Sequence, residues 1–324
     1  MTIARSFLTL AAVAGAIAIA APAQAQQWPQ RPVRVIVPFP AGGLTDGIAR
    51  LLSRRLSERF GQTFVVENMG GAAGAIAAST VARAPPDGYT LLVASLTQIG
   101  VVPALENVSY DPVRDFAPIS SIASAPFVLM VRPDFPARTL NELVDYIRSR
   151  PGRITYASAG VGSVAHLSMA LLLQRAGGEM IHVPYKGGAP AIVDLIAGHV
   201  ATYFGNRTDA VPHFKAGTIR LLAVSDESRS AQFPDVPTVA ESGYPGFRTI
   251  TWNGLMAPAR TPDAVIDRLA GEVQRAVKDK AFLESLANFG VDPVGDGPKE
   301  FAALIKTEIP KWAEAVAISG AKAP

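Results

Sequence analysis

The sequence predicts an α/β fold with largely parallel sheets, since strand and helix signals alternate along almost the whole chain of 324 residues. The strand candidates are rich in Val, Ile and aromatic residues, and the segments between them repeat apolar residues at helical spacing. Four unusual loops, at 38–46, 95–98, 158–163 and 205–209, directly follow predicted strands. Because ligands bind outside the carboxyl ends of strands in such sheets, these loops are expected to line one crevice.

Eight strands are expected in chain order. They cover residues 33–37, 64–67, 91–94, 127–131, 154–157, 181–183, 201–204 and 221–225. The first helix is expected over 45–60, where Ile48, Leu52 and Leu56 recur on one face and several arginines take the opposite, solvated face.

Helix-start and helix-stop signals place the later helices. Thr139 and Glu142 form a capping box for 140–149, and Thr261 is expected to cap a helix with Pro262 at its first position. The further expected helices are 189–197, 262–279, 281–289 and 299–318, the last two ending at Gly290 and Gly320. No strand is expected within this terminal helical block.

The first 25 residues have the pattern of a cleaved secretory signal. Arg5 supplies the basic start, residues 7–20 are apolar apart from Thr9, and residues 23–25 form a small-residue cleavage site. The alternative is a membrane anchor, but the uncharged stretch is short for a span. We therefore expect a soluble, exported protein that begins near Gln26 and works in the periplasm.

Composition excludes several classes of function. The chain has no cysteine, which excludes disulfides, thiolate zinc sites, cysteine nucleophiles and a lipid-modified N-terminal cysteine. The formal net charge of +3 falls to +2 without Arg5, and no basic run is interleaved with aromatics as nucleic-acid binding would require. The four histidines lack metal-ligand spacing, and no dinucleotide or phosphate-loop motif is present, so neither a metal nor a cofactor is expected.

The loop at 38–46 runs from a strand into a helix. Gly42 and Gly43 let bare backbone N–H groups approach a ligand, and a helix N-terminus favours an anion. Asp46 in the first turn would hold N–H groups or a water, or serve as an ordinary acid at a helix start.

The segment at 156–166 repeats the same pattern of strand, small-residue loop and helix start. Ser158 and Ser163 add hydroxyl groups, although Ser163 is equally suited to cap the helix. His166 is suited to act as a base or metal ligand, or to pack in the first turn and bond a neighbouring loop. In the third segment, 204–209, Arg207 is suited to bind a second ligand carboxylate or to form a surface ion pair.

A periplasmic serine hydrolase is the enzymatic alternative. Ser158 or Ser163, together with His166 and Asp209, supplies the residue types of a catalytic triad. The G-x-S-x-G nucleophile motif is absent, and a serine three residues before its histidine on one helix is poorly placed. This alternative predicts ester turnover that is lost when Ser163 is replaced.

Taken together, these motifs resemble the Bug proteins, which are the substrate-binding receptors of tripartite tricarboxylate transporters. The resemblance covers nearly all of the mature chain. Its motifs are WPQRPVR at 28–34, VPFPAGGLTD at 37–46, VVEN at 65–68, PDGYTLL at 86–92, YASAGVGSVAH at 156–166, VPYKG at 183–187, AVS at 223–225, DVPT at 235–238 and WNGLMAP at 252–258.

The resemblance implies a type II periplasmic-binding-protein fold, with two α/β domains around a central cleft and crossover strands joining them. The expected domains are 26–122 with 249–324, and 123–248. Such a receptor performs no chemistry: it captures a small carboxylate and delivers it, as a monomer, to the membrane subunits of a transporter or to a sensor kinase. A scaffold or sensor-partner role would use the same cleft, and the sequence does not identify the carboxylate.

Carried over by position, the resemblance implies a set of ligand contacts from both domains. They are Phe39, Ala41, Gly42, Gly43 and Asp46 from the first domain, Ser158, Ala159, Gly160, Gly162, Ser163 and His166 from the second, Ser95 and Thr97 on a side wall, and Asn206 and Asp209 on the opposite wall. The family commonly has Phe-Asp-Asn where this chain has Phe204-Gly205-Asn206. Because an acid is lost and Arg207 is gained, we expect the pocket to accept extra negative charge there.

Overall fold

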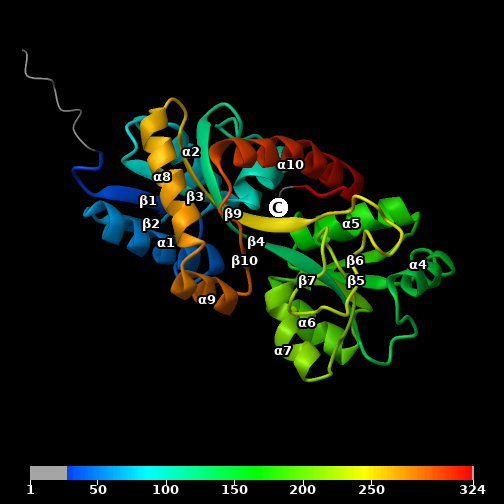
Figure 1. Cartoon of the computed structure of the whole chain (residues 1–324). Helices are drawn as coiled ribbons and strands as arrows, with labels where there is room; N and C mark the ends of the chain where they lie inside the picture. Colours follow the sequence, from blue (N-terminus) through cyan, green and yellow to red (C-terminus); the bar gives the residue numbers. More distant parts are fainter. Residues whose placement is uncertain (1–27, 323–324) are drawn as a thin grey trace, which may run out of the picture.

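The computed structural model describes residues 28–322, so the predicted signal at 1–25 lies outside the described residues. Two α/β lobes lie side by side, and strands β4 (Phe116–Val131) and β9 (Ile250–Pro258) lie between them (Figure 1). Helix α10 (Pro298–Ser319) runs from the first lobe over to α5 (Val164–Ala176) of the second. The lobes are therefore connected by two strands and by the packing of one helix.

The sheet of the first lobe is mixed. Strands β1 (Val33–Val37), β2 (Phe64–Asn68) and β3 (Thr90–Ser95) are parallel in the order β2-β1-β3. Strand β9 is antiparallel to β3, and β4 is antiparallel to β9. The prediction of largely parallel sheets holds within the β1–β3 block and not for the crossing strands.

In the second lobe, β7 (Thr202–Asn206), β5 (Thr155–Ser158) and β6 (Ile181–Pro184) are parallel, in that order, and β6 is the edge strand. The far half of β4 is antiparallel to β7 and to β8 (Arg220–Val224). Parallel strands direct their carboxyl ends to one edge of the sheet, so the loops after β5 and β7 leave from the same edge.

The strand predicted at 127–131 is only the last part of the 16-residue β4. From Phe116 to Pro126 the strand pairs with β9, and from Phe127 it pairs with β7, so one strand serves both lobes. Its first half contains Pro118, serines and Pro126, which read as a turn in sequence. Register shifts at Pro118/Ser120 and Ser121/Ala123 accommodate this composition.

Two further strands were not predicted. Strand β9 was not among the eight expected strands and begins next to the domain boundary expected at 248/249. The short β10 (Asp292–Pro293) pairs with β4 inside the block predicted to be helical. The expectation of no strand in that block was therefore wrong. Backbone pairing of β10 with residues distant in sequence leaves no local apolar pattern from which to predict it.

Most predicted helices are present with ends shifted by one to three residues. The remaining helices are α1 (Leu44–Phe60), α2 (Ala75–Ala82), α3 (Val102–Leu105), α4 (Leu140–Arg148), α6 (Gly188–Ala197), α7 (Arg207–Lys215), α8 (Asp263–Ala276) and α9 (Lys280–Asn288). Helices α2, α3 and α7 were not predicted; residues 207–209, expected in a loop, form the first turn of α7. Thr261 does not cap α8, because Pro262 is the N-cap and the Thr261 hydroxyl donates to the Pro258 carbonyl.

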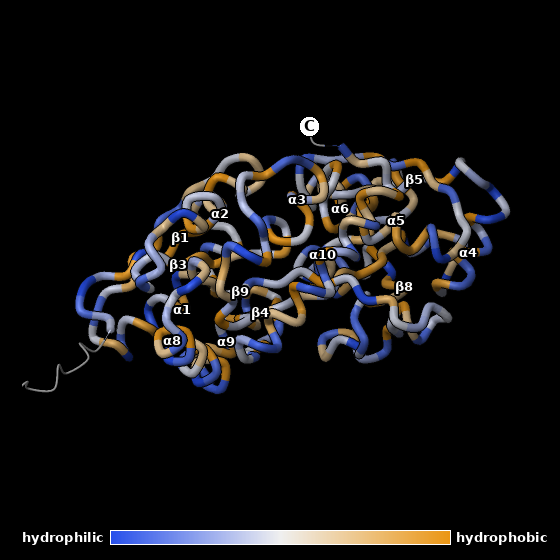
Figure 2. The backbone as a smooth tube through the Cα atoms, turned by 90° about the horizontal axis from the view of Figure 1, so that it is seen from above, coloured by the Kyte–Doolittle hydropathy of each residue, from blue (hydrophilic) through white to orange (hydrophobic). Residues whose placement is uncertain are grey.

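The interior is densely apolar. Trp252, Trp312 and Phe301 are fully buried, and the Trp252 and Phe301 rings meet edge to face with centroids 5.2 Å apart. Figure 2 shows hydrophilic residues gathering on the outer turns at both ends of the molecule. Within residues 28–322 no helix has the length and apolar character needed to cross a bilayer.

Candidate functional site

The loop between β1 and α1 is held by Asp46, whose carboxylate turns inward. One oxygen accepts from the Gly42 N–H at 2.9 Å and from Arg50 at 3.0 Å, and the other accepts from Asn68 at 2.8 Å. Asn68 also donates to the Phe39 carbonyl at 3.0 Å. Burial alone would raise the pKa of Asp46, but these hydrogen bonds outweigh it and hold the pKa below its ordinary value. Asp46 therefore shapes the loop from beneath.

Among residues 28–322, no side chain caps the N-terminus of α1. Gly43 is the N-cap in extended conformation, and no side chain in this range accepts from the first-turn N–H groups. Residues 41–44 are exposed, and Gly42 has a φ of +88° that favours glycine. Beneath the loop, the buried Asn253 of β9 donates to the Thr45 hydroxyl at 2.9 Å. The 17-residue helix α1 therefore begins at an exposed loop, with first-turn N–H groups that no side chain of the described residues caps.

The loop between β5 and α5 is ordered by its own serines. The Ser158 hydroxyl bonds the Gly160 backbone and lies 2.7 Å from Nε2 of His182. The Ser163 hydroxyl donates to the Gly160 carbonyl at 2.7 Å and accepts from the His166 N–H, so Ser163 is an N-cap. Both hydroxyls therefore define the shape of the loop.

His166 and His182 stack almost perfectly parallel, with ring centroids 3.8 Å apart and planes 4° apart, and Tyr156 stacks on His182 at 4.9 Å. Nδ1 of His166 accepts from the Gly162 N–H at 3.1 Å. Burial, reinforced by His182, lowers the pKa of His166 to about 4. The prediction that His166 packs in the first turn and bonds a neighbouring loop describes this arrangement. His182 was not singled out from sequence, although its pairing with Tyr156 across β5 and β6 brings it here.

Lowering the pH from 7 to 5 is expected to destabilise the fold through His166. Its pKa is lower in the folded chain than the ordinary value near 6.5, so the unfolded chain takes up the proton first and stability falls as the pH drops below about 6.5. The expected loss is about 2 kcal/mol between these two pH values. Urea unfolding of His166→Asn, whose amide oxygen replaces Nδ1 as acceptor, should lack this component. An equal pH dependence in both proteins would contradict the assignment.

The two lobes meet beside these loops. A Cβ atom on Gly162 would lie 2.7 Å from Leu105 of α3, so the second lobe's loop rests against the first lobe with no room for a side chain. Gly162 also has a φ of +72°. This contact places the β5–α5 loop at the junction of the lobes, as a shared crevice requires.

Arg207 lies at the start of α7 and is only 2% exposed. Its guanidinium donates to the Gly290 carbonyl at 2.8 and 3.2 Å, to Asp292 at 2.8 Å and to the Ser230 hydroxyl at 3.3 Å. Gly290 and Asp292 belong to the first lobe, so Arg207 links the lobes. Neither interpretation from sequence, a ligand carboxylate or a surface ion pair, describes this guanidinium, because it is buried and makes four hydrogen bonds within the protein.

Asp209 and Asn206, predicted to lie on one wall of the pocket, have different surroundings in the second lobe. Asp209 accepts from the Tyr203 hydroxyl at 3.0 Å, and its carboxylate leaves no room for a Cβ on Gly188, at the start of α6. Burial raises the pKa of Asp209 against the hydrogen bonds of Tyr203 and Asn206. Asn206 is half-buried at the N-cap of α7 without capping it through its side chain.

The side wall after β3 is internally bonded. The Ser95 hydroxyl and N–H both bond Oε1 of Gln98, at 2.8 and 2.9 Å, and the Gln98 amide reaches the Ala73 carbonyl. The Thr97 N–H donates to Ser95 at 3.3 Å. Gln98 is therefore the residue that fixes this wall, and sequence alone gave no signal for it.

The geometry does not assemble the catalytic triad of the hydrolase alternative. Among residues 28–322, the Ser163 hydroxyl bonds the Gly160 carbonyl and the His166 backbone, with no hydrogen bond to the His166 ring. Asp209 accepts a hydrogen bond from the Tyr203 hydroxyl and makes none with His166 or His182. In the same described range, no three His, Cys, Asp or Glu side chains form a group suited to a metal ion.

Comparison with known proteins gives consistent matches. A family model for the tripartite tricarboxylate transporter family receptor matches residues 48–320. Protein BugT of Bordetella pertussis is 38% identical over 307 residues, which cover 94% of each chain.

Solved structures align over nearly the whole chain as well. Rpa4515 of R. palustris, solved with adipate, is 36% identical with a TM-score of 0.75, covering 91% of this chain and 99% of the other. MatC of Rhodopseudomonas palustris, solved with malate, is 35% identical with a TM-score of 0.72, covering 89% of this chain and 100% of the other.

Proposed function

The chain belongs to the tripartite tricarboxylate transporter receptor family, a family of non-enzymatic periplasmic solute-binding receptors, and on this premise we propose that it binds an aliphatic dicarboxylate between its two lobes. Two relatives of 35–36% identity were solved with adipate and with malate. The observation that carries the proposal is the uncapped, exposed N-terminus of α1. Carboxylates are favoured at such a site by both the N–H groups and the helix dipole.

The proposed ligand contacts come from loops on both lobes. They are Phe39, Ala41, Gly42 and Gly43 from the first loop, Ser158, Ala159, Gly160, Gly162 and Ser163 from the second, with Thr97 and Asn206 at the sides. Asp46, Ser95, His166 and Asp209 support these loops through their own hydrogen bonds. The Gly42, Gly160 and Gly162 N–H groups already donate within their own loops, so the proposed backbone donors to the ligand are those at the start of α1. Binding through backbone donors suits capture and release of a ligand without chemistry.

We also propose the division into domains 26–122 with 249–324, and 123–248, hinged where β4 changes partner between Pro126 and Phe127. Closure of such domains around a ligand is the expected motion. The closed form would deliver the carboxylate to membrane subunits of a transporter or to a sensor. Export through a signal cleaved after Ala25 completes the proposal.

A thermal-shift screen of the chain from Gln26 onward tests the proposal. Adipate and malate are expected to raise the melting temperature, since a ligand that binds only the native state stabilises it, whereas dimethyl adipate should not. The protein is first unfolded and refolded to remove carried-over ligand. Hydrolysis of dimethyl adipate, or chemical conversion of any dicarboxylate, would favour an enzyme. The absence of any shift with mono-, di- and tricarboxylates would contradict the anion site.

A further inference from the structure

The loops proposed to hold the ligand supply little positive charge. The loops that follow β1, β2, β3 and β5 contain no lysine or arginine. Arg207, at the start of α7, is buried and donates to Gly290 and Asp292. A dicarboxylate carries two negative charges, and a helix N-terminus offsets only about half an elementary charge. A further cation beside these loops would therefore favour a ligand with two carboxylates.

Lys186 lies in the short loop between β6 and α6. Strand β6 is parallel to β5, with Pro184 paired to Ser158. Because parallel strands direct their carboxyl ends to one edge, this loop leaves the sheet at the same edge as the β5–α5 loop. Lys186 is exposed in this position.

The backbone on both sides of Lys186 is bonded to the β5–α5 loop. The Tyr185 N–H donates to the Ser158 carbonyl at 3.0 Å, and the Gly187 N–H donates to the Ala159 carbonyl at 3.2 Å. Lys186 therefore lies between two hydrogen bonds to residues proposed to contact the ligand. A lysine places its charge at the end of a flexible four-carbon stem, so the ammonium group can extend over this loop.

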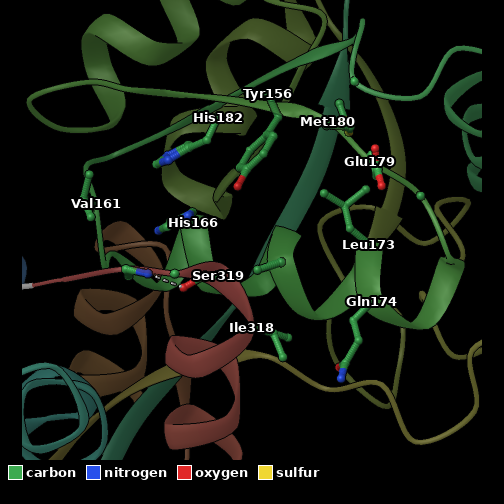
Figure 3. Close-up of a pocket in the computed structure, with 15 residues that line it drawn as sticks. Tyr156, Val161, His166, Leu173, Gln174, Glu179, Met180, His182, Ile318 and Ser319 are labelled. Atoms are coloured by element: carbon green, nitrogen blue, oxygen red, sulfur yellow. Dashed lines mark hydrogen bonds between the residues drawn. The ribbon is translucent and has the colours of Figure 1, made fainter.

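The strand that leads to Lys186 is anchored to the same loop. His182 of β6 stacks on His166 of α5 with ring centroids 3.8 Å apart, and Figure 3 shows the two side chains next to each other. Nε2 of His182 also lies 2.7 Å from the Ser158 hydroxyl. These contacts fix the end of β6 against the start of α5, so the position of the Lys186 backbone is well defined.

Two carboxylates lie near this loop, and neither forms an ion pair with Lys186. Asp194 of α6 accepts from the Tyr185 hydroxyl at 2.7 Å. Asp209 lies beside the first residue of α6 and accepts from the Tyr203 hydroxyl at 3.0 Å. Among residues 28–322, no carboxylate lies within 4.0 Å of the Lys186 ammonium group. Its charge is therefore available to a ligand.

We propose that Lys186 binds the second carboxylate of the ligand and so selects dicarboxylates over monocarboxylates; this inference rests on the proposed function. One carboxylate accepts from the N–H groups at the start of α1 in the first lobe. The other pairs with the Lys186 ammonium group of the second lobe. A dicarboxylate is thus held by charge from both lobes, whereas a monocarboxylate engages only one of the two sites.

Calorimetric titration of the chain from Gln26 onward with two ligands tests the role of Lys186. Lys186→Gln removes the charge and should weaken adipate about 10- to 30-fold. Monomethyl adipate has an uncharged ester in place of one carboxylate, so its affinity, measured by competition with adipate, should change less than about 2-fold. Lys186→Arg keeps the charge and should bind adipate within about 3-fold of the unaltered protein.

Lys215→Gln is the matched control for Lys186→Gln. Lys215 is an exposed lysine of the same lobe at the last position of α7, so its removal changes the net charge equally and should leave adipate affinity unchanged. Both variants should keep the melting temperature of the unaltered protein, because within the described part of the chain neither lysine forms an ion pair.

The outcomes separate this inference from the proposed function. Equal adipate affinity in Lys186→Gln and the unaltered protein would overturn the role of Lys186 and leave the proposed function intact. An equal loss of affinity for adipate and monomethyl adipate, or an equal effect of Lys215→Gln, would do the same. If adipate does not bind the unaltered protein at all, the proposed function fails and this inference fails with it.

Discussion

Replacing Gly43 with Asp is expected to reduce dicarboxylate affinity at least 100-fold while the protein stays folded. The new carboxylate would lie at the N-cap of α1. There it would accept hydrogen bonds from the first-turn N–H groups and repel a ligand anion. Gly43 has an extended conformation, with φ of −81° and ψ of 172°, and a Cβ there would meet nothing closer than the Pro40 carbonyl at 3.8 Å. Stability is therefore expected to change by less than about 1 kcal/mol.

The matched control for this experiment is Gly43→Ala. It adds the same Cβ without a cap or a charge, so it should keep the adipate-induced thermal shift of the unaltered protein. Calorimetric titration of both variants with adipate measures the difference. Retained affinity in Gly43→Asp would show that the ligand does not contact the α1 N-terminus, and the proposed site would have to be abandoned.

Replacing Arg207 with Ala is expected to lower the free energy of unfolding by about 3 kcal/mol. The substitution leaves the Gly290 carbonyl without its two donors and removes the charge that faces Asp292. It also leaves a cavity in a tightly packed region. The packing there is so close that a Cβ atom on Gly290 would lie 2.4 Å from the side chain of Thr208, the residue after Arg207. The loss concerns the contact between lobes, so urea unfolding is the direct measurement.

Two further variants separate the possible roles of Arg207. Arg207→Lys keeps the charge without the forked donors and should lose part of this stability. Arg229→Ala, which breaks the exposed pair of Arg229 with Glu241, should cost less than about 1 kcal/mol. If Arg207 contacts the ligand, as first expected from sequence, Arg207→Ala will lose dicarboxylate affinity with little loss of stability. Unchanged stability would contradict the interlobe link.

The local geometry of the candidate loops was predictable because it depends on short local patterns. The run from Val33 to Asp46 contains its strand, glycine turn and helix start within one continuous segment. The same holds for the N-cap formed by Ser163 and for the capping pair of Thr139 and Glu142. In each case the residues that interact are neighbours in sequence, so spacing alone specifies their geometry.

Long-range partners were not predictable in the same way. The sequence leaves open whether Asp46 points at a ligand or inward, and contact with Asn68 and Arg50 turns it inward. Arg207 follows a loop that resembles a ligand-binding segment, yet Gly290, 83 residues away, takes its guanidinium. Only residues 127–131 of β4 were predicted, because residues 116–126 form a strand by pairing with β9, which is distant in sequence.

The sequence by itself determined the α/β class, the positions of the glycine loops and the residue types that can meet an anion, since all of these follow from local periodicity and backbone freedom. Only the tertiary structure decided which donors stay free. Folding satisfies most buried polar groups with distant partners, as for Arg207 and Gln98. The donors left over at the start of α1 are known only once every long-range contact has formed.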